Sequence, residues 1–149
     1  MAETIVVGVD GSEGGAAALE FAAADAARRD ARLRIVVAWE MPVVGYDPDF
    51  PRSLDVQMLD AFRVRAERLA EDTLATAKKL QPSLDVEALA TQGPPADVLL
   101  EQSADADLIV VGRRGLGGFK SLLLGSVGNK VVHQATCPVV VVNQPATGS

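Results

Sequence analysis

The sequence predicts an α/β fold: a five-stranded parallel doubly wound sheet forming a three-layer α/β/α sandwich. Three observations predict it. Short apolar runs rich in Val and Ile alternate along the chain with stretches that carry Ala and Leu at helical spacing. The apolar runs lack polar alternation, which is typical of strands buried on both faces of a sheet. At 149 residues and 48% hydrophobic content, the chain is expected to form one domain over 1–149.

The first half of the chain predicts two strands, each followed by a helix. Continuous apolar runs rich in β-branched residues predict strands over 5–9 and 33–39. Between them, Ala and Leu recur at helical spacing over 14–28, and a second helical stripe runs from 59 to 80. The segment 41–53 contains three prolines and is expected to be a long loop, a feature often linked to function.

The second half continues the alternation and ends in a tail that is expected to fray. Its predicted elements are a weaker strand over 84–89, a helix opened by Pro94-Pro95 and running to Ser103, a strand over 108–111, a helix over 127–134 capped by Ser126, a strand over 139–142 and the tail 144–149.

The most informative stretch joins the fourth strand to the last helix and has the spacing Gly112-x2-Gly115-x9-Gly125-Ser126. Glycines let backbone N–H groups approach an anion, and a helix N-terminus adds unpaired N–H groups. A strand, a glycine loop and a helix start in this order predict a phosphate cradle and hence a nucleotide site. The alternative interpretation is a surface loop followed by a helix cap.

The first strand ends at Asp10-Gly11-Ser12, which lies near the same cradle if the first and fourth strands are neighbours. Ligands of doubly wound sheets bind outside the carboxyl ends of the strands, where the strand order reverses. Asp10 is then placed to accept hydrogen bonds from ribose hydroxyls. The alternative is an Asx turn in which Ser12 caps the following helix.

Other polar and aromatic residues leave two roles open. Arg113, Arg114 and Lys120 either meet phosphate oxygens or are solvated surface charges. Trp39 either packs in the core or walls the base pocket. His133 lies about two turns past the glycine loop and is better interpreted as a surface histidine than as a general base.

Composition and motifs exclude several classes. A net charge of −6 argues against binding to nucleic acid or to an acidic membrane surface. Cys137 is the single cysteine and is interpreted as a small packed hydrophobe. No long apolar segment or basic leader is present, so a cytoplasmic setting is expected. The turn after the first strand does not fit G-x-G-x-x-G, and no P-loop, acidic receiver cluster, catalytic triad or metal-ligand spacing occurs.

Four separated motifs give the chain a specific likeness. The glycine loop is accompanied by three further motifs: Val-Gly-Val-Asp10-Gly-Ser, Gly93-Pro94-Pro95 and Pro138-Val-Val-Val-Val142. Together the four motifs resemble the universal stress protein family over about 3–143. The resemblance implies the sheet order 3-2-1-4-5, a homodimer, and the branch that binds ATP, here expected with Mg²⁺. Some relatives bind cyclic AMP instead, and AMP is a further alternative.

Carried over by motif position, Asp10 and Gly112 are implied to lie by the ribose, and the backbone near Ala38 and Trp39 is implied to meet the adenine edge. The phosphates are implied to be held by Gly115, Gly125, Ser126 and the N–H of Val127. The residues implied to contact the nucleotide are Asp10, Gly11, Ser12, Ala38, Trp39, Gly112, Arg113, Gly115, Gly125, Ser126 and Val127. The double arginine after Gly112 departs from many relatives.

The function expected is a regulatory or stress-response protein that acts by binding an adenine nucleotide. No catalytic residue is assigned, so any ATP hydrolysis is expected to be slow. The alternatives are a slow ATPase or self-phosphorylating protein with Ser121 or Ser126 as acceptor, and a nucleotide-free dimeric interaction module. The dimer is expected to pair through Val139, Val140, Val141 and Val142, because an exposed apolar edge strand is an association hazard.

Overall fold

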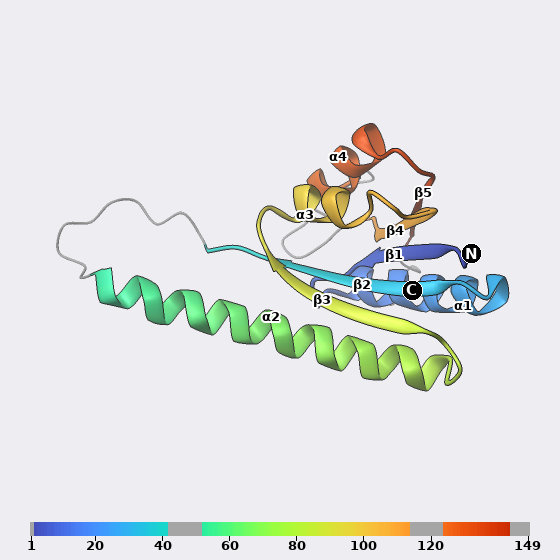
Figure 1. The fold of residues 1–149 in the computed structure, drawn as a ribbon. Coiled ribbons are helices and arrows are strands. Elements are labelled where there is room, and N and C mark those ends of the chain that lie inside the picture. Colours follow the sequence, from blue (N-terminus) through green and yellow to red (C-terminus); the bar gives the residue numbers. More distant parts are fainter. Residues whose placement is uncertain (1, 42–51, 114–123, 144–149) are drawn as a thin grey trace, which may run out of the picture.

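A computed structural model describes residues 2–41, 52–113 and 124–143. In it a five-stranded parallel sheet lies between two layers of helices (Figure 1), in the strand order β3-β2-β1-β4-β5. The strands are β1 (Thr4–Gly8), β2 (Arg32–Trp39), β3 (Val86–Gln92), β4 (Leu108–Gly112) and β5 (Val139–Val142). The helices are α1 (Glu13–Arg29), α2 (Arg52–Leu80), α3 (Pro95–Gln102) and α4 (Ser126–Gln134). The predicted fold class and strand order are confirmed.

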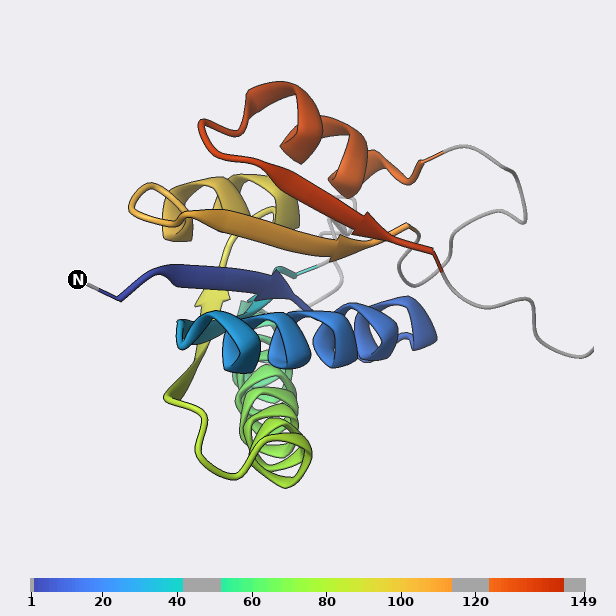
Figure 2. The same ribbon diagram turned by 90° about the vertical axis from the view of Figure 1, so that its right-hand side faces the viewer.

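Both faces of the sheet are packed, with α1 and α2 on one side and α3 and α4 on the other (Figure 2). Successive residues of a strand point to opposite faces. Accordingly, Ile5 and Val7 of β1 pack in the cluster under α1 and α2, and Val6 packs in the cluster under α3 and α4. This double burial is the reason that the strands read as uninterrupted apolar runs.

The direction of winding reverses between β1 and β4. The chain runs outward from β1 through β2 to β3 with α1 and α2 on one face, then returns across the sheet through α3 to β4. The two central strands are in register from Ile5↔Leu108 to Val7↔Val110. Their carboxyl ends therefore form the switch point at which doubly wound sheets bind ligands.

The third strand lies further along the chain than predicted. It occupies Val86–Gln92 instead of 84–89, because it pairs with β2 from Leu33↔Val86 to Trp39↔Gln92. Leu84 belongs to the preceding turn, where its N–H donates to the Gln81 carbonyl at 3.0 Å. The Ala-rich sequence of β3 has a weak preference of its own, so the partner strand sets its extent.

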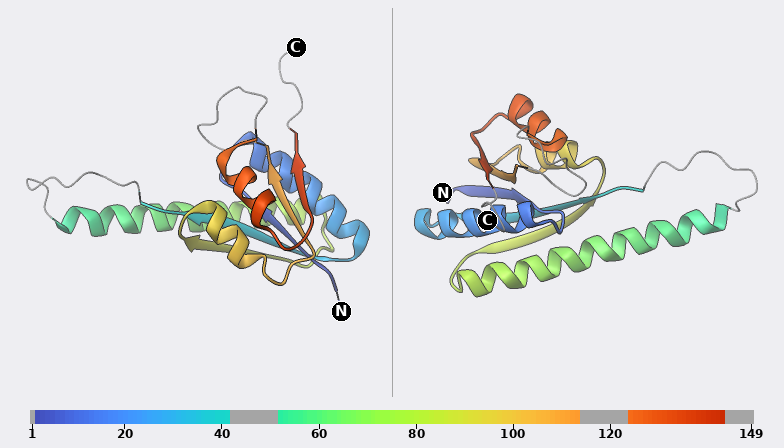
Figure 3. Two further views of the ribbon diagram at one scale, coloured as in Figure 1. Left: turned by 90° about the horizontal axis from the view of Figure 1, so that it is seen from above. Right: turned by 180° about the vertical axis from the view of Figure 1, so that it is seen from behind.

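Helix α2 begins earlier than its apolar stripe indicated. It starts at Arg52, inside the predicted loop 41–53, because no Gly or Pro interrupts the chain between Arg52 and Leu80. Its N-terminal half runs past the sheet (Figures 1 and 3), and Val56 and Met58 are exposed there. Residues 42–51 of the predicted loop and the tail 144–149 lie outside the described residues.

In the described ranges no helix combines the length and the apolar character needed to cross a bilayer.

Candidate nucleotide-binding site

The turn between β1 and α1 holds an aspartate at the carboxyl end of the sheet. Asp10 Oδ1 accepts hydrogen bonds from the Ser12 N–H at 3.0 Å and from the Ser12 hydroxyl. Ser12 Oγ in turn accepts from the Gly15 N–H at 3.1 Å and caps α1. Gly11 has φ +87°, a conformation that suits glycine. The Asx turn and the N-cap expected as one interpretation of these residues are therefore present, and they fix the carboxylate beside the switch point.

The end of β4 packs directly against the start of α1. A Cβ atom on Gly112 would lie 2.5 Å from the Gly14 carbonyl oxygen and 2.7 Å from its carbon, so only glycine fits. Gly112 and the Asp10 turn are thus brought to one place, as predicted for the two strand ends. Gly14 was not among the predicted site residues, although the Gly14-Gly15 pair at a helix start could have indicated a close backbone approach.

The two ends of the glycine loop are joined by a backbone hydrogen bond. The Gly125 N–H donates to the Arg113 carbonyl at 3.0 Å. Gly125 is extended, with φ −63° and ψ 165°, and it is the N-cap of α4. The prediction that Ser126 caps this helix is wrong, because the bond to Arg113 fixes the extended residue one position earlier and Ser126 is the first helical residue.

This N-cap has a consequence for the start of α4. Gly125 has no side chain to satisfy the N–H groups of the first turn, which includes Ser126 and Val127. Such a turn is suited to an anion. Gly115, Arg114, Lys120 and Ser121 lie outside the described residues.

Ala38 and Trp39, the two residues predicted to meet adenine, lie at the carboxyl end of β2, and their backbone groups face different neighbouring strands. The Trp39 carbonyl accepts the Gly93 N–H at 2.8 Å, so the backbone of Trp39 faces β3. Successive residues of a parallel strand face opposite neighbours, so the backbone groups of Ala38 face the side of β1, which ends at Gly8. The Trp39 side chain packs against the cluster under α1 and α2, which supports the core role of the two that the sequence left open.

The remaining candidate residues are placed away from this junction or at its rim. His133 is exposed in the last turn of α4, where its Nδ1 lies 2.7 Å from the Asn129 carbonyl oxygen. Cys137 is half-buried among the residues under α3 and α4, and burial, followed by the charge of Asp107, raises the pKa of its thiol. Arg113 Nη1 donates to Asn143 Oδ1 at 3.0 Å.

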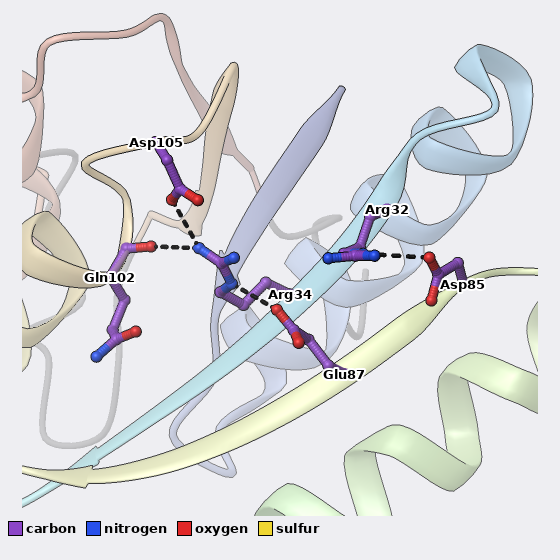
Figure 4. Close-up of polar contacts among 6 residues, drawn as sticks. All are labelled: Arg32, Arg34, Asp85, Glu87, Gln102 and Asp105. Carbon is purple, nitrogen blue, oxygen red and sulfur yellow. Dashed lines mark hydrogen bonds and ion pairs between the residues drawn. The ribbon is translucent and has the colours of Figure 1, made fainter. Parts of the chain in front are cut away.

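A partly buried arginine that the sequence reasoning missed joins three elements at the other end of the sheet (Figure 4). Arg34 of β2 donates from Nε to Glu87 at 2.7 Å, and from Nη1 to the Gln102 carbonyl and to Asp105, both at 2.8 Å. These bonds raise the pKa of Arg34, and the bond from Arg34 is the main reason that the pKa of Asp105 is lowered.

The position of Arg34 gives it a structural role rather than a place in the site. It pairs in register with Glu87, five residues before the β2–β3 ladder ends at Trp39↔Gln92. The signal in the sequence was the lone arginine inside the apolar run 33–37, since a charge between two packed layers requires partners.

A parallel sheet in the order β3-β2-β1-β4-β5 with helices on both faces defines a doubly wound α/β protein. The chain belongs to the universal stress protein family, whose model, described as "Universal stress protein family", matches residues 1–143.

Individual relatives agree with this membership. A universal stress protein from Thermus aquaticus is 41% identical over 146 residues, covering 95% of this chain and 99% of the relative. The chain spans only 46% of a universal stress protein from Mycobacterium tuberculosis, to which it is 33% identical over 145 residues.

Solved structures agree as well. A universal stress protein from Lactobacillus plantarum has the same fold, with a TM-score of 0.80 at 24% identity over 94% of this chain and 97% of that one. A universal stress protein solved in complex with cAMP has a TM-score of 0.68 and 30% identity over 96% of this chain and 98% of that one.

Proposed function

We propose that this protein binds an adenine nucleotide, ATP with Mg²⁺, across the carboxyl ends of β1, β2 and β4, and acts as a regulatory protein. The observation that carries the proposal is the contact between Gly112 and Gly14, where a Cβ would lie 2.5 Å from a carbonyl oxygen. This contact brings the Asp10 turn, the end of β4 and the base of the glycine loop to the switch point of the sheet. Ligands of this fold class bind at that point.

Each part of the nucleotide has suitable partners in this arrangement. The carboxylate of Asp10 is suited to accept hydrogen bonds from the ribose hydroxyls. The backbone of Ala38 faces the side of β1, beyond the end of that strand at Gly8, and is suited to bond the adenine edge. The phosphates would lie on the N–H groups of Gly125, Ser126 and Val127, with Gly115 and Arg113 beside them. Gly11 and Ser12 shape the turn that presents Asp10.

We expect Mg²⁺ to bind through the phosphates of ATP instead of through a set of protein ligands. Among the residues that the structure describes, no group of three His, Cys, Asp or Glu side chains is arranged to hold a metal. Mg²⁺ commonly keeps several waters and binds through substrate phosphates, so the site fits a magnesium–ATP complex without such a group.

Binding is a better description of the function than turnover. His133 is the single histidine of the chain, and it lies in the last turn of α4, at the opposite end from the proposed phosphate position. A general base needs hydrogen-bond reach to the group that it deprotonates. Hydrolysis of ATP is therefore expected to be slow, and occupancy of the site is the signal.

Cyclic AMP is the competing ligand, because a 30% identical universal stress protein was solved in complex with it. The guanidinium of Arg113 at the base of the loop favours a ligand with more phosphate charge. Calorimetry with ATP, AMP and cyclic AMP, each with Mg²⁺, ranks the three. Mass spectrometry of small molecules released on denaturing protein purified without added nucleotide identifies the ligand that the protein carries.

The substitution Asp10→Asn tests the site itself. The amide keeps an oxygen for the Ser12 N–H but loses the charge that strengthens bonds from ribose hydroxyls, so ATP should bind about tenfold more weakly or worse. Asp72→Asn, at an exposed position of α2, is the matched control and should bind as the wild type does. Equal affinity of all three proteins for ATP would overturn the proposed site.

A further inference from the structure

Two exposed apolar side chains flank the edge strand β5, one from each helical layer. Phe21 of α1 is 39% exposed and Val132 of α4 is 44% exposed. Scattered exposed apolar residues are ordinary on a protein surface. These two differ because both of their helices contact β5, from opposite faces of the sheet (Figure 2).

The first turn of α1 shows which side of that helix is nearer to β5. A Cβ on Gly112, in β4, would lie 2.5 Å from the Gly14 carbonyl oxygen, whereas a Cβ on Gly15 would lie 3.3 Å from the Asp10 nitrogen, just after β1. Because β4 lies between β1 and β5, the side of Gly14 is the side toward β5. Phe21 follows Gly14 by seven residues, about two helical turns, and therefore lies on this side.

The ion pair between α3 and α4 orients the other helix in the same way. Lys130 Nζ of α4 lies 2.5 Å from Asp97 Oδ1 of α3. Val132 is two residues further along, about 200° around the helix, so it faces away from α3. Since α3 contacts β1 and β2 and α4 contacts β5, this direction leads past the edge of the sheet.

Both apolar side chains lie near the middle of β5. Each follows by seven residues the glycine that anchors its helix at the end of β4, Gly14 in α1 and Gly125 in α4. Seven helical residues span about 10 Å, the length of about three strand residues. Counted back from the end of β4, this is the level of Val110, whose partner in β5 is Val140.

The backbone between the two side chains is self-complementary. The carbonyls of Pro138 and Val142 accept from β4, so the N–H and C=O groups of Val139 and Val141 point away from the sheet. A twofold axis through Val140 places Val139 of each copy opposite Val141 of the other, and each of these pairs can exchange two hydrogen bonds.

We propose that Phe21, Val132 and the four valines of β5 form one dimer surface, which a second copy of the chain covers with Val140 opposite its own counterpart. Directly opposite residues of antiparallel strands share a face of the sheet. The second Phe21 therefore lies on the α1 face and the second Val132 on the α4 face, where each extends the cover of the valines. The dimer surface does not depend on the nucleotide site, so a failure to bind ATP would leave it standing.

Charged substitutions at the two flanks test the dimer surface. Phe21→Glu and Val132→Glu should each raise the dimer dissociation constant at least tenfold with unchanged circular dichroism, because a charge is costly to bury without a partner. Leu80→Glu is the matched control, because Leu80 is 41% exposed at the end of α2 and lies outside this surface. Analytical ultracentrifugation should give the control and the wild type the same dissociation constant.

Cross-linking tests the register without these variants. In a Cys137→Ala protein, Val140→Cys should form an intermolecular disulfide, because opposite residues of a pair that is not hydrogen-bonded have Cα atoms about 4.5 Å apart. Val142→Cys, on the same face, should not, because the two copies of residue 142 would be about 13 Å apart.

Three results would overturn the proposal. The first is a wild type that sediments as a monomer at micromolar concentration. The second is a dimer that either glutamate variant leaves as stable as Leu80→Glu does. The third is a disulfide that forms through residue 142 and not through residue 140.

Discussion

Gly112 and Gly128 both lie where a methyl group would meet a neighbour, but the two neighbours differ. At Gly112 the nearest atoms belong to the Gly14 backbone, at 2.5 and 2.7 Å from the ideal Cβ. At Gly128 the nearest atom is the Leu124 Cδ1, at 2.8 Å, the far end of a flexible side chain. A packed backbone cannot move aside cheaply, whereas a leucine can change rotamer.

The two alanine variants should therefore differ in stability. Gly112→Ala forces the end of β4 away from α1 and should lower the free energy of unfolding by about 2 kcal/mol or more. Gly128→Ala should stay within about 1 kcal/mol of the wild type, because alanine is the better helix former and offsets part of the crowding. Chemical denaturation measures both, and a smaller loss for Gly112→Ala than for Gly128→Ala would contradict the close approach on which the site depends.

At the scale of elements, Arg34 links β2 to β3 and to the end of α3 through Glu87, Asp105 and the Gln102 carbonyl. Its side chain is 14% exposed, whereas Arg63, which bonds to Asp60 and Glu67 on the outside of α2, is 46% exposed. Surface ion pairs within one helix contribute little. A shielded arginine that also serves a backbone carbonyl contributes more, because its loss leaves polar groups without a donor.

Replacing each arginine by methionine tests this difference. At pH 7, Arg34→Met should lower the free energy of unfolding by about 1–3 kcal/mol, through the lost bond to the Gln102 carbonyl and its neighbours. Arg63→Met should leave it nearly unchanged. Urea titrations of the two variants and the wild type give the comparison, and equal losses would show that burial adds nothing at Arg34.

The same variant has a pH signature. The pKa of Asp105 is lowered in the folded protein, chiefly by its hydrogen bond from Arg34. A group with a lowered pKa contributes stability above its unfolded pKa and loses it as the pH falls through the folded value. The difference in the free energy of unfolding between the wild type and Arg34→Met should therefore become smaller below a pH of about 4, the ordinary range in which carboxyl groups titrate.

At the scale of the whole molecule, β5 is an edge strand of the described sheet. We propose that a second copy of the chain pairs with this strand. The side chains of the strand are already engaged, because Val140 and Val142 pack under α1 and α2 and Val139 and Val141 pack on the other face. The backbone is the available part. Carbonyls of Pro138 and Val142 accept from β4, so alternation turns the N–H groups of Val139 and Val141 outward.

Proline at an outward position removes a donor from the edge and leaves the ladder to β4 intact. Val141→Pro should therefore keep the circular dichroism of the wild type and sediment as a monomer, whereas the wild type sediments as a dimer. Val140→Pro is the contrasting variant, because it removes an N–H that faces β4 and should unfold the strand. A Val141→Pro protein that still sediments as a dimer would place the interface elsewhere.

Most of the fold was predictable because it depends on local patterns. Apolar runs rich in Val and Ile predicted β1, β2, β4 and β5 to within one residue, and the Pro-Pro start of α3 was also correct. The β3 register and the start of α2 were not predictable. The first depends on pairing with β2, and the second occurs where the helix runs past the sheet (Figure 1).

The sequence by itself determined the alternation of strands and helices and the glycines of the candidate site, because residue spacing and backbone preference act over a few neighbours. The tertiary structure alone decided that Gly112 meets Gly14, that Gly125 instead of Ser126 caps α4, and that Arg34 and Arg113 find partners far along the chain. Those contacts join residues up to 98 positions apart in the sequence, as between Gly14 and Gly112. No local pattern encodes such a pair, because it forms only when the packed layers bring the two backbones together.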